Sequence, residues 1–392
     1  MKILNTVFLF LIIIGLFTSY SCKKRTTTDY VIEVDTVYGS SKSDTSKAGY
    51  ILLSPFTTPQ DSGTLIMLDG IGNTIRQKRT AHGAMNFKRW VTNGQVRYTW
   101  SEFDPNAYVI PIINNVCFVN VIADSNLNEI KRVTLLPHND ILTDKAQGTD
   151  LHDFIYLADN HYITLSYYMK MATNIPDSLA AGGSGEVVFP VIQEILNDQV
   201  IFQWEGADFP EFYATSIEGN NFNQTYTPQD YMHLNSMIVD PTDNNLIVSC
   251  RNLNQVLKID RQSGAIVWRL GGKNSDFPIT PDQKFLRQHF ASLTDNNQTL
   301  ILFDNGDINE RPSSRIVEFQ LNQSAKAING FRIYNIPEPF SQIMGDVQKF
   351  GSHYFIGGGS GRYFLDVNYL TGEKYKEIQI QQQSYRTLRY LE

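Results

Sequence analysis

Residues 230–272 read DYMHLNSMIVDPTDNNLIVSCRNLNQVLKIDRQSGAIVWRLGG, and this stretch decides the fold. It contains three or four short apolar or alternating runs, separated by turn-forming clusters such as Asp243–Asn245. Runs of this length with turns between them predict antiparallel strands, in the size and order of one propeller-like blade. His233, Asn235 and Arg251 lie on backbone that we expect to face inward, although packing a sheet requires no polar or cationic side chain there. These three residues are therefore candidates for a site.

The rest of the chain repeats this pattern. Helical periodicity is scarce, and many short strands at regular spacing favour an all-β sandwich, barrel or propeller. Units of strand, turn, strand, loop, strand and turn begin, in chain order, at Ala48, His82, His152, His233, His289 and Asp346. Six such units fit a six-bladed β-propeller over residues 48–392, whose ring closure removes exposed sheet edges. The final SYRTLRYL, Ser384–Leu391, is expected to supply a closing strand.

A histidine begins four of the six units, at His82, His152, His233 and His289, and Asp346 replaces it in the last unit. Equivalent positions of different blades lie on one ring around the propeller axis. We therefore expect the imidazoles to converge on an active site in the central channel, with Arg251 nearby on the second strand of its unit. The alternative is that this histidine is a structural element of the repeat that bonds a neighbouring blade.

Composition excludes several classes of function. The net charge of −7 argues against nucleic acid as a partner, because phosphate-binding faces are usually basic. No H-x-H or H-E-x-x-H pair is present, so no metal or other cofactor is expected. Beyond Cys22, the chain has only Cys117 and Cys250, which cannot form a disulfide scaffold. They form either one bond or two buried thiols.

The N-terminus reads as a targeting segment. Residues 1–21 have a lysine, an apolar run over Val7–Phe17 and small or polar residues before Cys22, which predicts a signal peptide of the lipoprotein type. The run is too short to span a bilayer. We expect lipidation of Cys22, a flexible tether over residues 22–47, and an exported protein in the periplasm or cell envelope, anchored to a membrane. An ordinary cleaved signal peptide is the alternative, and Ser19 stands where a lipobox normally has leucine.

At this point the residues resemble a known family, the bacterial arylsulfate sulfotransferases, in a lipoprotein-type form. The resemblance runs from about Leu151 to the C-terminus and is strongest over residues 230–319. An ordered series of short motifs carries it: DLHDF (150–154), HLNSM (233–237), SCRNLNQVLKID (249–260), GAIVWRLGG (264–272), QHFASL (288–293), LFDNG (302–306) and SRIVEF (314–319). Each motif alone is weak, but their order along the chain is specific.

The resemblance implies a propeller enzyme that moves a sulfuryl group between phenols without a nucleotide donor. His289 is then the nucleophile that becomes transiently sulfated, and His152, His233, Asn235 and Arg251 surround the sulfuryl group. An arginine suits the negative sulfuryl oxygens, and a second histidine suits proton transfer to and from the phenols. The implied partners are an aryl sulfate donor and a phenol acceptor.

The chain departs from the family pattern at three places. Between Cys22 and about Lys47 we expect no separate N-terminal β-domain of the kind that some members have. No cysteine lies near His289 in the sequence, and the resemblance supplies no role for His82. Two other interpretations stay open: a non-catalytic propeller lipoprotein that binds a sulfated or anionic ligand, and a quinoprotein dehydrogenase. The second is suggested by RQSGAIVWRL (261–270), of which only one good copy is visible.

Overall fold

The computed structural model describes residues 49–106, 118–141, 148–224 and 227–391. The chain divides into a unit of residues 1–31 and a unit of residues 32–392, and all described residues belong to the second. The predicted signal peptide, tether, Cys22 and Cys117 lie outside the described residues. None of the described helices is long and apolar enough to cross a membrane.

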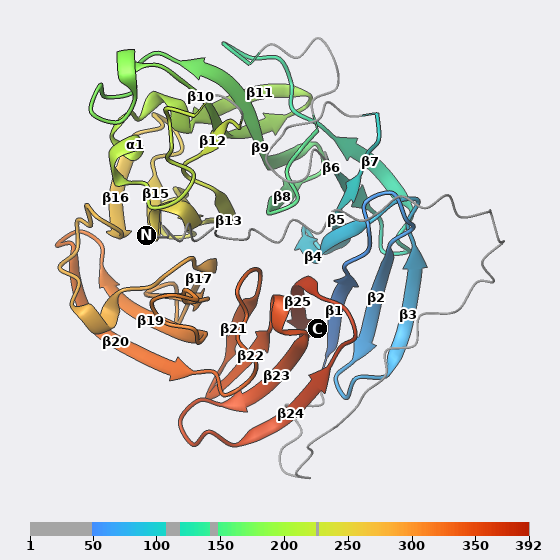
Figure 1. Ribbon diagram of the computed structural model, residues 1–392. Coiled ribbons are helices and arrows are strands. Elements are labelled where there is room, and N and C mark those ends of the chain that lie inside the picture. The colour runs from blue at the N-terminus through green and yellow to red at the C-terminus, as the bar shows by residue number, and fades with distance from the viewer. Residues whose placement is uncertain (1–48, 107–117, 142–147, 225–226, 392) are drawn as a thin grey trace, which may run out of the picture. The chain divides into compact units, whose positions relative to one another are not determined.

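The described chain forms six sheets arranged as a ring (Figure 1). Blade 1 consists of β25 (Ser384–Tyr390), β1 (Tyr50–Pro55), β2 (Thr64–Asp69) and β3 (Thr74–Arg79). Blade 2 consists of β4 (Ala84–Thr92), β5 (Gln95–Phe103), β6 (Phe118–Ala123) and β7 (Glu129–Val133). Blade 3 consists of β8 (Phe154–Ala158), β9 (His161–Ala172), β10 (Gly185–Leu196) and β11 (Gln199–Glu205), with β12 (Gln229–Asp230) paired in parallel to β10.

The remaining blades have the same order. Blade 4 consists of β13 (Leu234–Val239), β14 (Leu246–Cys250), β15 (Gln255–Ile259) and β16 (Ile266–Gly271). Blade 5 consists of β17 (His289–Thr294), β18 (Thr299–Asp304), β19 (Arg315–Asn322) and β20 (Ala327–Asn335). Blade 6 consists of β21 (Asp346–Phe350), β22 (His353–Gly357), β23 (Tyr363–Asn368) and β24 (Lys374–Gln379). Among the described residues, helical structure is limited to α1 (Glu211–Thr215) and the 3-10 turns η2 (Ala181–Gly183), η3 (Gly206–Asp208), η4 (Arg251–Leu253), η5 (Pro281–Gln283) and η6 (Gly359–Gly361).

This arrangement confirms the predicted all-β, six-bladed propeller. The ring is closed by the C-terminal strand, since β25 pairs antiparallel with β1 from Tyr50↔Tyr390 to Pro55↔Ser384. Blade 1 thus combines the first three strands of the propeller with its last strand, as the sequence of residues 384–391 predicts. The closing strand β25 thus covers the edge of β1 that would otherwise be unpaired.

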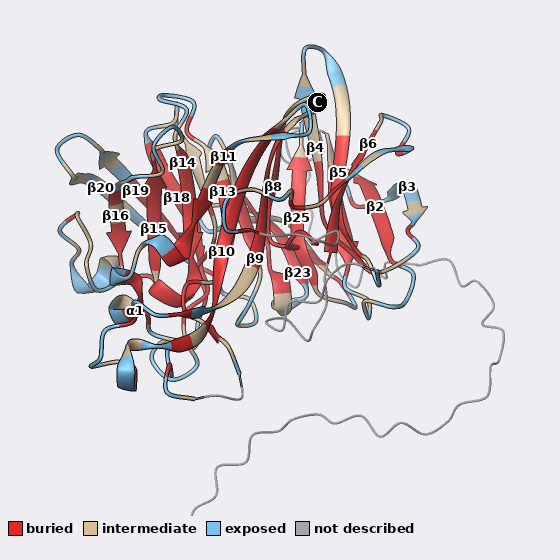
Figure 2. Cartoon of the chain, turned by 90° about the horizontal axis from the view of Figure 1, so that it is seen from above, coloured by how far each residue is buried: buried red, intermediate tan, exposed pale blue. Residues whose placement is uncertain are grey.

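Hydrophobic packing between adjacent blades holds the ring together. Trp268 of blade 4, for example, is buried in one cluster with Leu302 and Phe319 of blade 5. Figure 2 shows buried residues concentrated in the strands and exposed residues mainly in the loops. The pattern follows from sheets that are covered on both faces by neighbouring blades, because such strands read as nearly continuous apolar runs.

The first residues of the repeat lie where the innermost strands begin (Figure 1). His152 and His233 precede β8 and β13 closely, and His289 and Asp346 are the first residues of β17 and β21. The repeat register is therefore confirmed at these four positions. It brings residues that are far apart in sequence to one end of the inner strands.

Candidate active site

A cavity of about 390 Å³ lies where the six blades meet, in the size range of sites for small organic molecules. Its lining comes from the segment after β1 and from β25, both of blade 1, from blades 2 to 5, and from the segment that leads into blade 6. The lining residues are Phe56, Pro59, Gln60, Met85, Phe118, Leu151, His152, His233, Arg251, His289, Ile343, Met344 and Tyr385.

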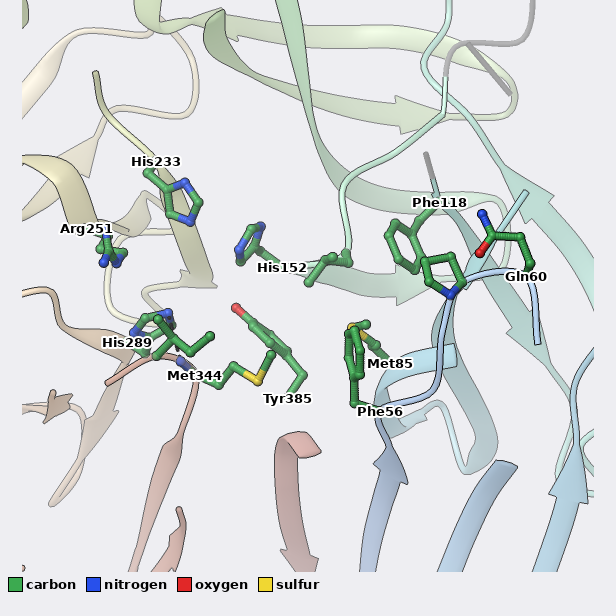
Figure 3. Close-up of a pocket in the computed structure, with 13 residues that line it drawn as sticks. Phe56, Gln60, Met85, Phe118, His152, His233, Arg251, His289, Met344 and Tyr385 are labelled. Carbon is green, nitrogen blue, oxygen red and sulfur yellow. Dashed lines mark hydrogen bonds between the residues drawn. The ribbon is translucent and has the colours of Figure 1, made fainter. Parts of the chain in front are cut away.

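The cavity has two chemically different halves (Figure 3). His152, His233, Arg251 and His289 come from blades 3 to 5 and form one half. Phe56, Met85 and Phe118 lie at the opposite end, with Tyr385 and Met344 between the two halves. Among the lining residues, Arg251 is the only one with a permanently charged side chain. The cavity thus offers donors for an anion at one end and an apolar surface for an aromatic body at the other.

Two histidines are each held by an aspartate. Nδ1 of His152 lies 2.5 Å from Oδ1 of Asp150, which also accepts the backbone N–H of His152. Nδ1 of His233 lies 2.6 Å from Oδ2 of Asp230, whose other oxygen accepts the backbone N–H of His233. A carboxylate at Nδ1 fixes the orientation of an imidazole and leaves its Nε2 to give or take a proton. Both rings are therefore suited to proton transfer.

The two rings are also close to each other. The ring centroids of His152 and His233 are 4.8 Å apart, with the planes nearly perpendicular. Tyr385 packs edge-on against the other side of His152, at 5.4 Å between centroids. The aspartate-bound imidazoles thus form a single wall of the cavity, and the other titratable residues of the lining are Arg251, His289 and Tyr385.

His289 is held differently, by an amide. Its Nδ1 lies 2.7 Å from Oδ1 of Asn305 and 3.1 Å from the backbone oxygen of Arg287. The orientation of the Asn305 amide is fixed, because its nitrogen donates to the backbone oxygens of Ser341 and Met344. Its oxygen must therefore face His289 and accept a hydrogen bond from the N–H at Nδ1. This leaves the lone pair of the His289 ring on Nε2.

The environment of His289 favours its neutral form. Burial, and next to it the positive charge of Arg251, hold the pKa of His289 well below its usual value of 6.5. Nε2 accepts one long hydrogen bond, of 3.3 Å, from the backbone N–H of Met344. A buried, neutral imidazole with its lone pair on a known atom is a nucleophile in its reactive form.

Arg251 is the first residue of η4 and follows β14, whereas the sequence predicts it on the strand itself. The strand ends at Cys250 because the backbone turns into a 3-10 conformation there. Nη1 of Arg251 donates to Oε2 of Glu218 at 2.8 Å and to Oδ1 of Asn252 at 2.7 Å. The arginine still borders the cavity, as predicted.

Asn235 is fully buried and is not among the residues that line the cavity. Its side-chain nitrogen donates to the backbone oxygen of Gln288 at 2.7 Å, directly before His289 in the chain. Its backbone oxygen accepts the hydroxyl of Tyr385 and Nη2 of Arg386, both at 2.9 Å. The predicted contact between Asn235 and substrate stays a prediction, and the observed contacts position the backbone around His289.

His82 does not join the other three histidines at the cavity. It lies before β4 begins at Ala84, and its ring packs edge-on against Phe103 at 5.7 Å between centroids. Its backbone oxygen accepts the N–H of Gly63 and the hydroxyl of Thr80, which ties it to blade 1. Blade 2 contributes Met85 and Phe118 to the cavity in its place.

Two further predictions concern cysteine and metal. Cys250 is buried and forms no disulfide with any described residue, while its pairing with Cys117 lies outside what the structure describes. Burial raises the pKa of the Cys250 thiol well above its usual range. Within the described part of the chain, no group of three His, Cys, Asp or Glu residues is arranged to hold a metal ion.

Three residues of the site were not predicted from the sequence: Asp150, Asp230 and Asn305. Each hydrogen-bonds one of the three cavity histidines through Nδ1. A sequence signal was present for the two aspartates, which precede their histidines by two and three residues. Asn305 is 16 residues from His289 and becomes its neighbour only because β17 and β18 pair, with His289 opposite Phe303.

Comparison with known families agrees with this geometry. The profile of the arylsulfotransferase (ASST) family matches residues 191–390, just over half of the chain. The chain belongs to the arylsulfotransferase family. The matched range contains His233, Arg251, His289 and Asn305, and it starts after His152. Family membership suggests aryl sulfotransferase activity, with small aryl sulfates and phenols as substrates.

Other comparisons are more distant. No curated protein matches the chain at a significant level. A solved structure of a protein of unknown function from Bacteroides caccae has a TM-score of 0.44 at 9% identity, covering 85% of this chain and 94% of its own. The periplasmic gluconolactonase PpgL of Pseudomonas aeruginosa has a TM-score of 0.40 at 12% identity, covering 87% and 98%. At these values neither likeness bears on the function.

Proposed function

We propose that this arylsulfotransferase moves a sulfuryl group from a phenolic sulfate ester to a phenolic acceptor without a nucleotide donor, through a sulfated His289. The observation that carries the proposal is the geometry at His289, which is buried, bonded at Nδ1 to Asn305 and lines the cavity together with Arg251. The fold does not require such a histidine at a cavity wall, so its position there indicates a role in chemistry. Covalent catalysis by such a group splits one difficult transfer into two easier displacements.

In the first displacement, Nε2 of His289 attacks sulfur and the bond between sulfur and the aryl oxygen breaks. The departing oxygen takes a proton from the ring of His152 or His233, which Asp150 or Asp230 holds in place at Nδ1. Arg251 faces the sulfuryl oxygens, which carry negative charge throughout. The products are a free phenol, a neutral general base and an N-sulfo imidazolium, whose proton stays on Nδ1 and remains hydrogen-bonded to the oxygen of Asn305.

In the second displacement, an acceptor phenol replaces the first one. The neutral imidazole of His152 or His233 removes the phenolic proton, the oxygen attacks sulfur, and the bond between sulfur and Nε2 breaks. His289 returns to its neutral form and the general base returns to its protonated form. Because one histidine serves as acid and then as base, the enzyme returns to its starting state without a metal or an organic cofactor in either step.

The apolar half of the cavity would hold the ring of the donor or acceptor. Phe56, Met85 and Phe118 offer apolar and aromatic surface, and no charged side chain lies among the lining residues at that end. A ring that carries a carboxylate would lose its hydration there without gaining a partner, which is costly. Uncharged phenols are therefore the better acceptors.

The proposal is tested with p-nitrophenyl sulfate as donor and two acceptors, 2-naphthol and 4-hydroxybenzoate. We expect release of p-nitrophenol that depends on acceptor, and a kcat/KM for 2-naphthol higher by about tenfold or more, because the carboxylate must be desolvated. Product formation is followed by absorbance and chromatography. Tight binding of the sulfate ester with no product from any acceptor would contradict the proposal and favour a ligand-binding propeller.

We also propose that the protein is exported and anchored to a membrane through lipid on Cys22. The support is the sequence of residues 1–22 alone, where a charged start and an apolar run precede the cysteine. Metabolic labelling with a fatty acid should mark the wild-type protein and leave Cys22→Ala unmarked. Equal labelling of the two proteins, or none in the wild type, would contradict the assignment.

A further inference from the structure

The loop Ser216–Gly219 follows α1 and does not line the cavity, but it holds Arg251 and its neighbours in place. Three consecutive residues of this loop make the contacts. The N–H of Ile217 donates to the backbone oxygen of Asn252 at 2.9 Å. Glu218 binds Arg251, and Gly219 is pressed so closely on the backbone oxygen of Asp230 that a Cβ would lie 2.0 Å from it. Gly219 has a φ of +62°, which only glycine adopts without cost.

Glu218 and Asn252 bind the same end of the Arg251 guanidinium. Both accept from Nη1, which has only two protons to donate. Asn252 is itself fixed, because its side-chain nitrogen donates to the backbone oxygen of Asp230 at 2.7 Å. Among the described residues, neither Nε nor Nη2 of Arg251 has a hydrogen-bond partner. These two atoms form the planar fork that binds two oxygens of a tetrahedral anion.

Glu218 also balances charge at this edge of the cavity. Its Oε2 lies 2.8 Å from Nη1 of Arg251 and 2.8 Å from Nη1 of Arg287. Arg287 has a second partner, Asp307, at 2.5 Å from its Nε, whereas Arg251 has no other carboxylate within ion-pair distance in the described structure. Glu218 therefore supplies the counter-charge of Arg251 while no sulfuryl group is bound.

We propose that Glu218 is a positioning residue for sulfuryl transfer, which turns the free fork of Arg251 toward the sulfuryl group and lowers the affinity of the site for free sulfate. The proposal rests on the proposed function. It gives the carboxylate two separable effects. Its hydrogen bond orients Arg251 for the transition state, and its negative charge opposes any anion that binds in the ground state.

The experiment compares Glu218→Gln and Glu218→Ala with the wild type in two assays. The first is binding of inorganic sulfate to the full chain by calorimetry. The second is steady-state transfer from p-nitrophenyl sulfate to 2-naphthol. For Glu218→Gln we expect sulfate to bind about fivefold more tightly, since one opposing charge is removed. We expect kcat to fall about tenfold, because Arg251 loses its charged anchor. Glu218→Ala should shift both quantities in the same directions, with the larger loss in kcat.

Glu211→Gln is the matched control. Glu211 lies on α1, is exposed to the same degree as Glu218 (side chains 40% and 41% exposed), and pairs with Arg269 at 2.9 Å. Neither Glu211 nor Arg269 lines the cavity, so Glu211→Gln should leave sulfate affinity and kcat unchanged. Thermal unfolding of each variant shows whether the fold is intact.

The outcomes separate this inference from the proposed function. Weaker or unchanged sulfate binding in Glu218→Gln, or no measurable sulfate binding in any variant, overturns the role of Glu218, and so does an unchanged kcat. A wild type without transfer activity overturns the proposed function. If the wild type is inactive but Glu218→Gln still binds sulfate more tightly than the wild type, the effect of Glu218 on anion binding at Arg251 is supported independently of the proposed function. A merely structural role for Glu218 predicts that sulfate affinity and kcat fall together.

Discussion

Replacing His289 with alanine is expected to abolish sulfuryl transfer and to leave the fold intact. The rate should fall by about 10⁴-fold or more, the scale seen when a covalent nucleophile is removed from an otherwise complete site. His289→Ala leaves Arg251 and the two aspartate-bound histidines in place, so binding of the aryl sulfate should persist. Intact-mass analysis of wild-type protein, incubated with donor and without acceptor, should show an adduct of about 80 Da, the mass of SO₃, and the variant should not form it.

His82→Ala provides a matched control for this experiment. His82 begins a repeat unit as His289 does, but its ring packs against Phe103 away from the cavity. His82→Ala should retain the adduct and most of the turnover. Turnover by His289→Ala close to that of the wild type would show that another group is the nucleophile. Turnover in the wild type without an adduct would instead favour direct transfer between the two phenols.

The fold was predictable because the information for it is local and repeated. Each unit carries its own strands and turns, so a register error in one unit would be visible against the others. The closing strand followed from the same logic, since residues 384–391 have no partner within the last unit and pair with β1. The repeat does not predict the exact backbone path at the start of each inner strand. At this position His82 is bonded to blade 1, whereas the other three histidines line the cavity.

The site was predictable only in part, for a physical reason. The repeat phase indicates which residues share a ring around the axis, and it placed His152, His233 and His289 together correctly. Hydrogen bonds between side chains depend on rotamers and on pairing between strands, which no periodicity records. Asn305 reaches His289 through the pairing of β17 and β18, and Asn235 points at the backbone of Gln288.

Arg251→Ala should reduce kcat/KM for the donor by about 10²- to 10³-fold, since one charged and buried partner of the sulfuryl oxygens is lost. Arg251→Lys should fall between this variant and the wild type, because an ammonium keeps the charge but lacks the planar fork. The matched control is Arg269→Ala, which removes an arginine that also pairs with a glutamate but does not line the cavity. Its transfer activity should equal that of the wild type.

The pH profile distinguishes loss of binding from an effect on the nucleophile. Next to burial, the charge of Arg251 lowers the pKa of His289, because a second positive charge nearby disfavours the imidazolium form. Without Arg251, the pKa of His289 should rise toward its usual value of 6.5. Since only neutral His289 attacks sulfur, the acid limb of donor desulfation should move to higher pH, and the deficit of Arg251→Ala should be larger at about pH 6 than at about pH 8. A deficit that is the same at every pH would mean that Arg251 binds the sulfuryl group without affecting the nucleophile.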